Sequence, residues 1–111
     1  LRSLRLMLFE STIKGGNYLG SYVSDNAIEI TGYDKEDLLD GDFFISRIHP
    51  QERKRFINES KLGLQAGTCE LTFRFKMQNG AYEMTRVYFS LKDENHVFGT
   101  WQIISELISP E

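Results

Sequence analysis

The chain contains 111 residues, with 13 Lys and Arg, 16 Asp and Glu, 41% apolar residues and a single Cys. This length suits one compact domain, which at about 100 residues buries enough surface to fold without a disulfide or metal. The longest apolar run, Leu6 to Phe9, is far shorter than the roughly 20 residues that span a bilayer. The formal net charge of −3 disfavours a dedicated nucleic-acid binder, because such proteins carry net positive charge.

The chain begins with Leu, no signal-peptide pattern follows it, and one Cys fits a reducing compartment. We therefore expect a cytoplasmic fragment of a longer protein that makes no membrane contact. Charge is uneven: residues 24–45 hold seven acids and one base, and residues 47–61 hold five bases and two acids. We expect two solvated helical faces that attract each other.

A β-hairpin is predicted at the N-terminus. Residues 5–13 are rich in strand formers, and Lys14-Gly15-Gly16-Asn17 follows them. Glycines accept the positive φ of tight hairpin turns, so residues 18–23 are predicted as the returning strand. A helical N-terminus is the alternative, which the spacing of three leucines would also suit: Leu1, Leu4 and Leu8.

Several short helices are predicted between residues 25 and 46. Ser24-Asp25-Asn26 offers side-chain oxygens that can cap a helix, and Gly32 suits a left-handed helix end. Asp34 is predicted to cap a second short helix, and Gly41 to break the chain again. A longer helix then begins near Pro50, which fits a first helical position, and ends near Gln65.

Three antiparallel strands complete the predicted order. After Gly67 the apolar period changes to two, and Asn79-Gly80 is a strong hairpin signal between the strands before and after it. Residues 93–95 form the next predicted turn, and residues 97–105 the last strand. One strand face is predicted to hold Leu71, Phe73, Phe75 and Met77, and the next strand to present Thr85, Val87, Phe89 and Leu91 to the same side.

This order of elements and the residues that fill it resemble a PAS domain, a sensory fold of signalling proteins. Residues 48–53, Ile-His-Pro-Gln-Glu-Arg, match the family's Ile-His-Pro-x-Asp-Arg segment with Glu52 in place of Asp. Arg74 and residues 79–82 match its Arg-x-x-x-x-(Asp/Asn)-Gly-x-(Tyr/Phe) hairpin. Further matches follow in order at residues 22–25, 30–33, 36–39 and Gly99.

The resemblance covers about residues 18–106 and implies an α+β PAS-like fold. This fold is a five-stranded antiparallel sheet with short helices and one longer helix on one face. We expect residues 1–111 to form a single PAS-like sensor domain, with an N-terminal strand or capping segment at 1–14. The family usually ends its last strand with Asp-Ile-Thr. The equivalent here is Ile103-Ile104-Ser105, which lacks the Asp that couples the domain to its output module.

The resemblance also implies a cup between sheet and helices, where ligands lie in this family. The period-two pattern directs six side chains toward this space, and these are the candidate ligand-binding residues: Phe73, Phe75, Thr85, Val87, Phe89 and Trp101. They would either line a pocket for a small apolar or aromatic ligand or fill the cup as core.

We expect no flavin. In the flavin-binding branch, the positions matching Phe75, Thr85 and Trp101 carry amide side chains. That branch also uses a reactive Cys in an Asn-Cys-Arg motif on the helical side. Neither feature is present, since Cys69 lies at the start of a strand.

Haem, metal and catalytic sites are not expected either. Haem would need an axial His on the helical wall, whereas His49 is predicted to cap a helix and His96 to lie in a turn. Asp93, Glu94 and His96 on one exposed hairpin leave a metal site incomplete. A strand-start Cys69 with no helix dipole has little reason for a lowered pKa, so we expect it to be a half-buried apolar residue.

The outer sheet face is predicted to be apolar for a solvent surface. Met84, Tyr88 and Ile104 lie on it, which suits cover by the N-terminal segment or by a second subunit. PAS relatives commonly pair in this way, so we expect a homodimer.

The resemblance implies a sensory module of a multidomain bacterial signalling protein. Ligand or partner binding would change packing and pass through Ile103, Ile104, Ser105 and Glu106 to a C-terminal output domain. Family habit indicates a histidine kinase or a cyclic-di-GMP enzyme, a diguanylate cyclase or phosphodiesterase. The alternatives are a ligand-free PAS dimerisation scaffold, which the bulk of Trp101 favours, and a small hydrolase that uses Cys69.

Overall fold

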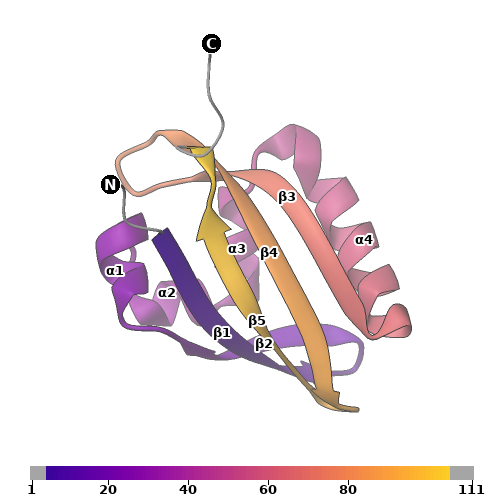
Figure 1. The fold of residues 1–111 in the computed structure, drawn as a ribbon. Coiled ribbons are helices and arrows are strands. Elements are labelled where there is room, and N and C mark those ends of the chain that lie inside the picture. Colours follow the sequence, from indigo (N-terminus) through magenta and orange to yellow (C-terminus); the bar gives the residue numbers. More distant parts are fainter. Residues whose placement is uncertain (1–4, 106–111) are drawn as a thin grey trace.

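In the computed structural model, which describes residues 5–105, five strands form one antiparallel sheet in the order β2-β1-β5-β4-β3 (Figure 1). The strands are β1 (Arg5–Lys14), β2 (Asn17–Val23), β3 (Thr68–Lys76), β4 (Tyr82–Asp93) and β5 (His96–Ile103). The helices are α1 (Asn26–Thr31), α2 (Lys35–Leu39), α3 (Gly41–Arg47), the 3-10 helix η1 (Pro50–Glu52) and α4 (Arg53–Ala66). The predicted fold class is confirmed.

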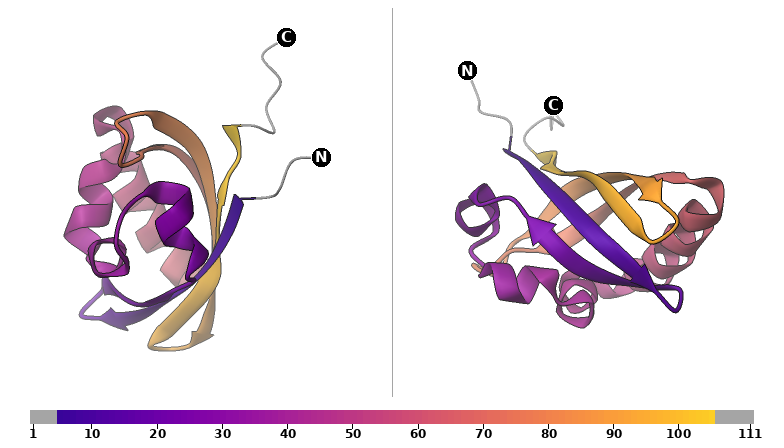
Figure 2. Two further views of the ribbon diagram at one scale, coloured as in Figure 1. Left: turned by 90° about the vertical axis from the view of Figure 1, so that its left-hand side faces the viewer. Right: turned by 90° about the horizontal axis from the view of Figure 1, so that it is seen from below.

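The helices cover one face of the sheet (Figure 2). The last three strands are contiguous, and seven of the eight inner-face residues predicted by the period of two are buried: Leu71, Phe73, Phe75, Met77, Thr85, Val87 and Phe89. The eighth, Leu91, is half-buried near the end of β4. Phe75 and Trp101 lie on this same face with their ring centroids 4.9 Å apart. The core therefore lies between the sheet and the helical layer. Among residues 5–105 no helix has the length and apolarity needed to cross a bilayer.

The predicted turns are present. Gly15 and Gly16, with φ of 59° and 80°, join β1 to β2, and Gly80, with φ of 92°, lies in the turn between β3 and β4. These positive φ values are readily available only to glycine, so the two hairpins are specified locally. The predicted N-terminal strand therefore replaces the helical alternative over the described residues.

The short helices form where predicted, and Gly32, with φ of 85°, ends α1 in the left-handed region as predicted, but the caps at the helix N-termini differ. Ser24 Oγ accepts a hydrogen bond from the Leu8 amide and Asn26 Nδ2 donates to the Leu6 carbonyl, so these side chains tie α1 to β1 instead of capping it. Asp34 also makes no side-chain cap. Asp40 caps α3 by accepting from the amides of Asp42 and Phe43, and Gly41 begins that helix where a break was predicted.

Within residues 5–105 no ion pair joins segment 24–45 to segment 47–61, and the attraction between the acidic and basic helical faces stays a prediction. Asp25 pairs with Lys35 within the first segment, and Glu59 with Arg55 within the second. Two of the basic side chains bind backbone carbonyls. Arg53 donates to the Ser46 and Ile48 carbonyls, and Arg55 donates to the Thr72 carbonyl.

One ion pair joins the start of the long helix to the sheet. Glu52 accepts hydrogen bonds from the Arg74 amide at 2.6 Å and from Arg74 Nε at 2.8 Å, with 17% of its side chain exposed. Partial burial alone would raise the pKa of Glu52, but these hydrogen bonds and the guanidinium charge lower it overall. Glu52 thus fastens the start of the long helix to β3.

We predict that Glu52→Gln lowers the free energy of unfolding by about 1–3 kcal/mol at pH 7, because the charge-assisted hydrogen bonds are lost. The native pKa of Glu52 lies below its ordinary value of 4.5, so this stabilisation is complete above that pH and is lost as pH falls through the native pKa. Urea denaturation of both proteins across the acidic range measures this.

The matched control is Glu59→Gln, which removes the exposed i,i+4 partner of Arg55 on α4. It should change the unfolding free energy by less than about 0.5 kcal/mol. Equal losses in the two variants would contradict the structural role assigned to Glu52.

Candidate functional site

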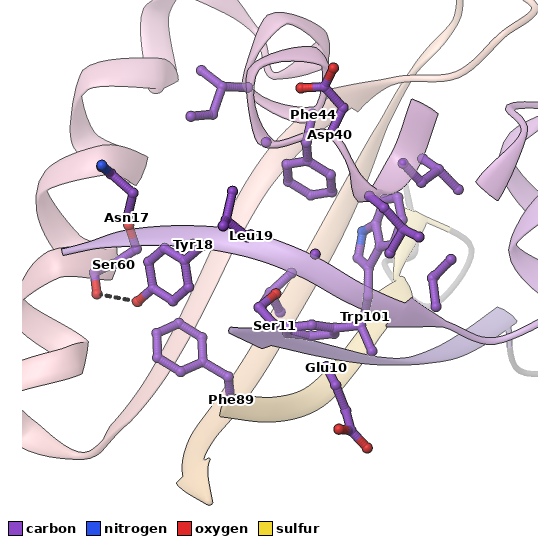
Figure 3. A pocket seen from close by; sticks show the side chains of 18 of the residues that line it. Glu10, Ser11, Asn17, Tyr18, Leu19, Asp40, Phe44, Ser60, Phe89 and Trp101 are labelled. Carbon is purple, nitrogen blue, oxygen red and sulfur yellow. Dashed lines mark hydrogen bonds between the residues drawn. The ribbon is translucent and has the colours of Figure 1, made fainter. Parts of the chain in front are cut away.

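A cavity of about 510 Å³ lies between the sheet and the helices (Figure 3). Strand β2 and the end of α2 form one side, α3 and α4 another, and the inner faces of β1, β4 and β5 the floor. Its apolar lining comes chiefly from Phe9, Tyr18, Leu19, Tyr22, Val23, Leu38, Leu39, Phe44, Ile45, Phe56, Ile57, Val87, Phe89 and Trp101. A concave space of this size and lining is typical of a small-molecule site.

Phe44 of α3 holds the helical wall against the sheet. Its ring centroid lies 4.9 Å from that of Phe75, 5.1 Å from Trp101 and 6.1 Å from Phe73. Edge-on and tilted aromatic contacts of this kind add to the stabilisation from burial. Phe56 of α4 joins the same cluster, 6.0 Å from Phe44. The cavity is the space that this cluster leaves toward β2.

The six candidate residues divide into two groups. Val87, Phe89 and Trp101 line the cavity. Phe73, Phe75 and Thr85 are buried on the same face of the sheet but do not border the cavity. Phe73 and Phe75 lie behind Phe44, and the Thr85 hydroxyl donates to the Phe73 carbonyl at 3.2 Å. These three residues therefore belong to the packing layer beside the site.

The helical wall opposite the sheet was expected, but the residues that form it were not identified from the sequence. It depends on a close approach between β2 and α2: a Cβ added at Gly20 would lie 2.7 Å from the Leu39 carbonyl oxygen. Only glycine allows this contact without a shift of one element. The sequence offered one signal for this contact, because a single glycine within a strand, here Gly20, often marks a site where another backbone approaches closely.

The polar groups of the cavity are few. Tyr18 Oη donates to the Ser60 carbonyl at 2.8 Å, and burial, aided by Cys69, raises the Tyr18 pKa well above its usual range. Trp101 is 3% exposed, and its buried indole Nε1–H finds no acceptor among residues 5–105. The charged lining residues are Glu10, Asp40, Asp42 and Lys61.

Neither histidine lines the cavity. His49 caps η1 as predicted, with Nδ1 accepting from the Gln51 amide at 3.2 Å, and His96 Nδ1 lies 2.8 Å from Asp93 Oδ1 on the exposed hairpin. Over residues 5–105, no group of three or more His, Cys, Asp or Glu side chains is placed to hold a metal ion.

Cys69 is half-buried at the start of β3, as expected for a packing residue. Its Sγ lies 3.6 Å from the Glu59 carbonyl oxygen. Burial, together with the negative charge of Glu59, raises the pKa of the thiol. A raised pKa reduces the thiolate population, which opposes a nucleophilic role.

The segment after β5 stays attached to β4. The Ile104 amide donates to the Met84 carbonyl at 2.9 Å, and the Met84 amide donates to Ser105 Oγ at 2.6 Å. Ile104, expected on the open outer face, is instead buried at 7% exposure because its backbone continues the pairing. Glu106, the last residue of the expected relay, lies outside the described residues.

Comparison with known proteins identifies the family. The fold and the cavity define a small sheet-and-helix domain with a partly open, largely apolar, ligand-sized space. The family model described as PAS fold matches residues 21–104. The chain therefore belongs to the PAS fold family. No match was found among curated proteins.

Solved structures share the fold. The N-terminal domain of a diguanylate cyclase with PAS/PAC sensor from Marinobacter aquaeolei has a TM-score of 0.79 at 16% identity, over 92% of this chain and 97% of that one. An RNA-binding light-oxygen-voltage receptor has a TM-score of 0.71 at 15% identity, over 93% of this chain but 29% of that one. A tryptophan-to-alanine variant of the Drosophila melanogaster Cycle PAS-B domain with bound glycerol has a TM-score of 0.67 at 14% identity, over 86% and 98%.

We predict that Gly20→Ala separates β2 from α2 and lowers the free energy of unfolding by about 1–3 kcal/mol, because the added Cβ overlaps the Leu39 backbone. Gly41→Ala is the control: its Cβ would lie 3.3 Å from the Tyr18 carbonyl oxygen and it gains helix propensity at the start of α3. Thermal and urea denaturation measure the free energy of unfolding of both variants and of the natural chain. A Gly20 variant as stable as the Gly41 variant would show that the contact is adaptable.

Proposed function

We propose that this PAS-fold chain is the sensor module of a multidomain bacterial signalling protein. A small ligand binds the cavity, or a partner binds nearby, and the resulting change of packing reaches a C-terminal output domain. A histidine kinase or a cyclic-di-GMP enzyme is the expected output, and the chain acts as a regulatory domain without catalysis of its own.

The observation that supports this proposal is the placement of β5. Trp101 lines the cavity, and Ile103 lies two residues later on the same inner face, where it pairs with both Arg5 and Thr85. A displacement of Trp101 therefore acts directly on the strand that leads out of the domain. The relay is Ile103, Ile104 and Ser105, continuing into Glu106.

A ligand-free dimerisation scaffold is the second candidate. The aromatic cluster of Phe44, Phe73, Phe75 and Trp101 fills much of the cup without a ligand, which favours this function. The cavity that remains beside the cluster favours the sensor. Direct binding of small molecules to the cavity distinguishes the two.

We also propose that the chain pairs with a second copy through the outer sheet face. Four large apolar side chains on three adjacent strands are exposed there: Leu6 (37%), Leu8 (51%), Tyr88 (44%) and Phe98 (48%). Leu8 and Tyr88 both pair with Thr100, from either side. An apolar patch of this kind is best covered by an identical patch related by a twofold axis. Met84, also expected there, is half-buried.

We predict that Ser105→Ala loosens the exit segment, because the Met84 amide loses its acceptor. Amide hydrogen exchange at Met84 should become about five- to tenfold faster, the effect of one lost hydrogen bond. Ser90→Ala is the control on the same strand, since Ser90 Oγ bonds only the exposed Tyr88 hydroxyl.

In the intact parent protein, Ser105→Ala should change the basal output activity, and Ser90→Ala should leave it unaltered. If Met84 exchanges faster while the output stays the same, the relay through this segment is wrong.

We predict that Tyr88→Glu dissociates the dimer, because two carboxylates would face each other across the twofold interface. Sedimentation equilibrium should give twice the 12.9 kDa chain mass for the natural protein and the monomer mass for the variant. Leu62→Glu on α4 is the control, as Leu62 is 62% exposed on the helical layer. A monomeric natural chain, or dissociation by both variants, would refute this interface.

A further inference from the structure

The buried indole of Trp101 is the unusual polar group of the cavity. Buried N–H groups in proteins nearly always have an acceptor, and leaving one unpaired destabilises the folded state because its hydration is lost without replacement. Trp101 Nε1–H has none among residues 5–105, although the residue is 3% exposed. Figure 3 shows the nitrogen edge of the indole turned toward the cavity side that Phe44 and Leu19 share.

The surroundings explain why no protein group pairs with it. The rings nearest Trp101 are those of Phe44 and Phe75, at 5.1 and 4.9 Å, and neither carries an acceptor. Thr85, the polar residue two positions along the inner face of the adjacent strand, is already engaged, since its hydroxyl donates to the Phe73 carbonyl. The free energy of an unmade hydrogen bond is therefore available to a molecule that enters the cavity.

The charged residues around the cavity limit which class of ligand it can bind. Two exposed carboxylates, Asp40 and Asp42, border the cavity with one exposed cation, Lys61, whereas Glu10 pairs with Phe98 and points away from the cavity on the outer sheet face (Figure 3). Asp40 is engaged in capping α3, but its charge remains. This balance of charge opposes anionic ligands such as carboxylic acids and phosphates.

We propose that the cavity binds an uncharged, largely aromatic molecule carrying one hydrogen-bond acceptor, such as a carbonyl or ring nitrogen, which accepts from Trp101 Nε1–H. This inference rests on the proposed ligand-sensing function and makes Trp101 its specificity-determining residue. Because the nitrogen is buried, the acceptor reaches it through a small movement of the indole on β5. Recognition of the acceptor is thereby coupled to movement of the cavity wall.

The test uses three matched probes. 2-Acetylnaphthalene has a neutral acceptor, 2-ethylnaphthalene has nearly the same shape without one, and 2-naphthoate is an anion. Dissociation constants are measured by calorimetry for the natural chain, for Trp101→Phe and for Phe44→Leu, which changes the cavity wall but removes no polar group. The ratio of the ketone and hydrocarbon constants cancels the shared apolar contribution.

The preference for ketone over hydrocarbon should fall about five- to tenfold in Trp101→Phe, as expected for one neutral hydrogen bond, and stay unchanged in Phe44→Leu. The naphthoate should bind at least about tenfold more weakly than the ketone, since transferring a carboxylate from water into a largely apolar cavity is unfavourable. Trp101 is the single tryptophan. Its one indole N–H resonance should therefore shift downfield with the ketone and not with the hydrocarbon.

Two outcomes would overturn the proposal, and they distinguish a failure of the Trp101 hydrogen bond from a failure of ligand sensing itself. If ketone and hydrocarbon bind but the preference and the indole resonance do not respond to the carbonyl, Trp101 is not the donor, while ligand sensing stands. If no probe binds the natural chain, both this inference and the ligand-sensing function are wrong, and the scaffold remains. The resonance measurement needs only the natural chain, so a misfolded variant does not prevent the decision.

Discussion

The contact between Phe44 and the inner face of the sheet is the constraint on which the helical wall depends. Helices α1, α2 and α3 have 6, 5 and 7 residues. Isolated helices shorter than about 12 residues are marginal in water, so these exist only through packing. Phe44 supplies that packing for α3 through its contacts with Phe75 and Trp101, whereas α1 buries Ala27 and α2 buries Leu38. The position of Phe44 therefore determines where α3 lies against the sheet and how much space is left toward β2.

The sheet was predictable from the sequence, whereas the caps and the exit segment were not. Strict alternation over Leu71 to Met77 identifies a buried face, because a strand repeats every two residues. Ser24 and Asn26 carry helix-capping side chains, yet β1 provides nearer partners at Leu6 and Leu8. Such competition between local and long-range hydrogen bonds is decided by tertiary structure.

The sequence predicted which face of the sheet carries the site, but not where on that face the cavity opens. Alternation gives Phe73, Phe75, Val87 and Trp101 the same face, but it does not show that α4 packs over β3 while the cavity opens toward β2. The strand order β2-β1-β5-β4-β3 places the cavity, and that order follows from long-range pairing. The helical wall was equally inaccessible, because fewer than two turns give too little periodicity to assign a buried face.

If ligand binding at this site switches the domain between two states, apolar contacts supply most of the binding free energy and the Trp101 hydrogen bond supplies the specificity. Moving a two-state equilibrium from 1:99 to 99:1 requires a differential binding free energy of about 5.5 kcal/mol. A single hydrogen bond from Trp101 contributes about 1 kcal/mol of this, roughly a fivefold shift. Most of the remainder must come from apolar surface, at about 25 cal/mol per Å², so a ligand needs to bury roughly 150–200 Å² more in one state than in the other. Phe9, Phe44, Phe56 and Phe89 supply that apolar surface around the indole. A ligand that makes only apolar contacts would then shift the equilibrium between the two states, but the site would not distinguish it from other ligands of the same shape. The buried N–H of Trp101 favours the ligand that carries a hydrogen-bond acceptor.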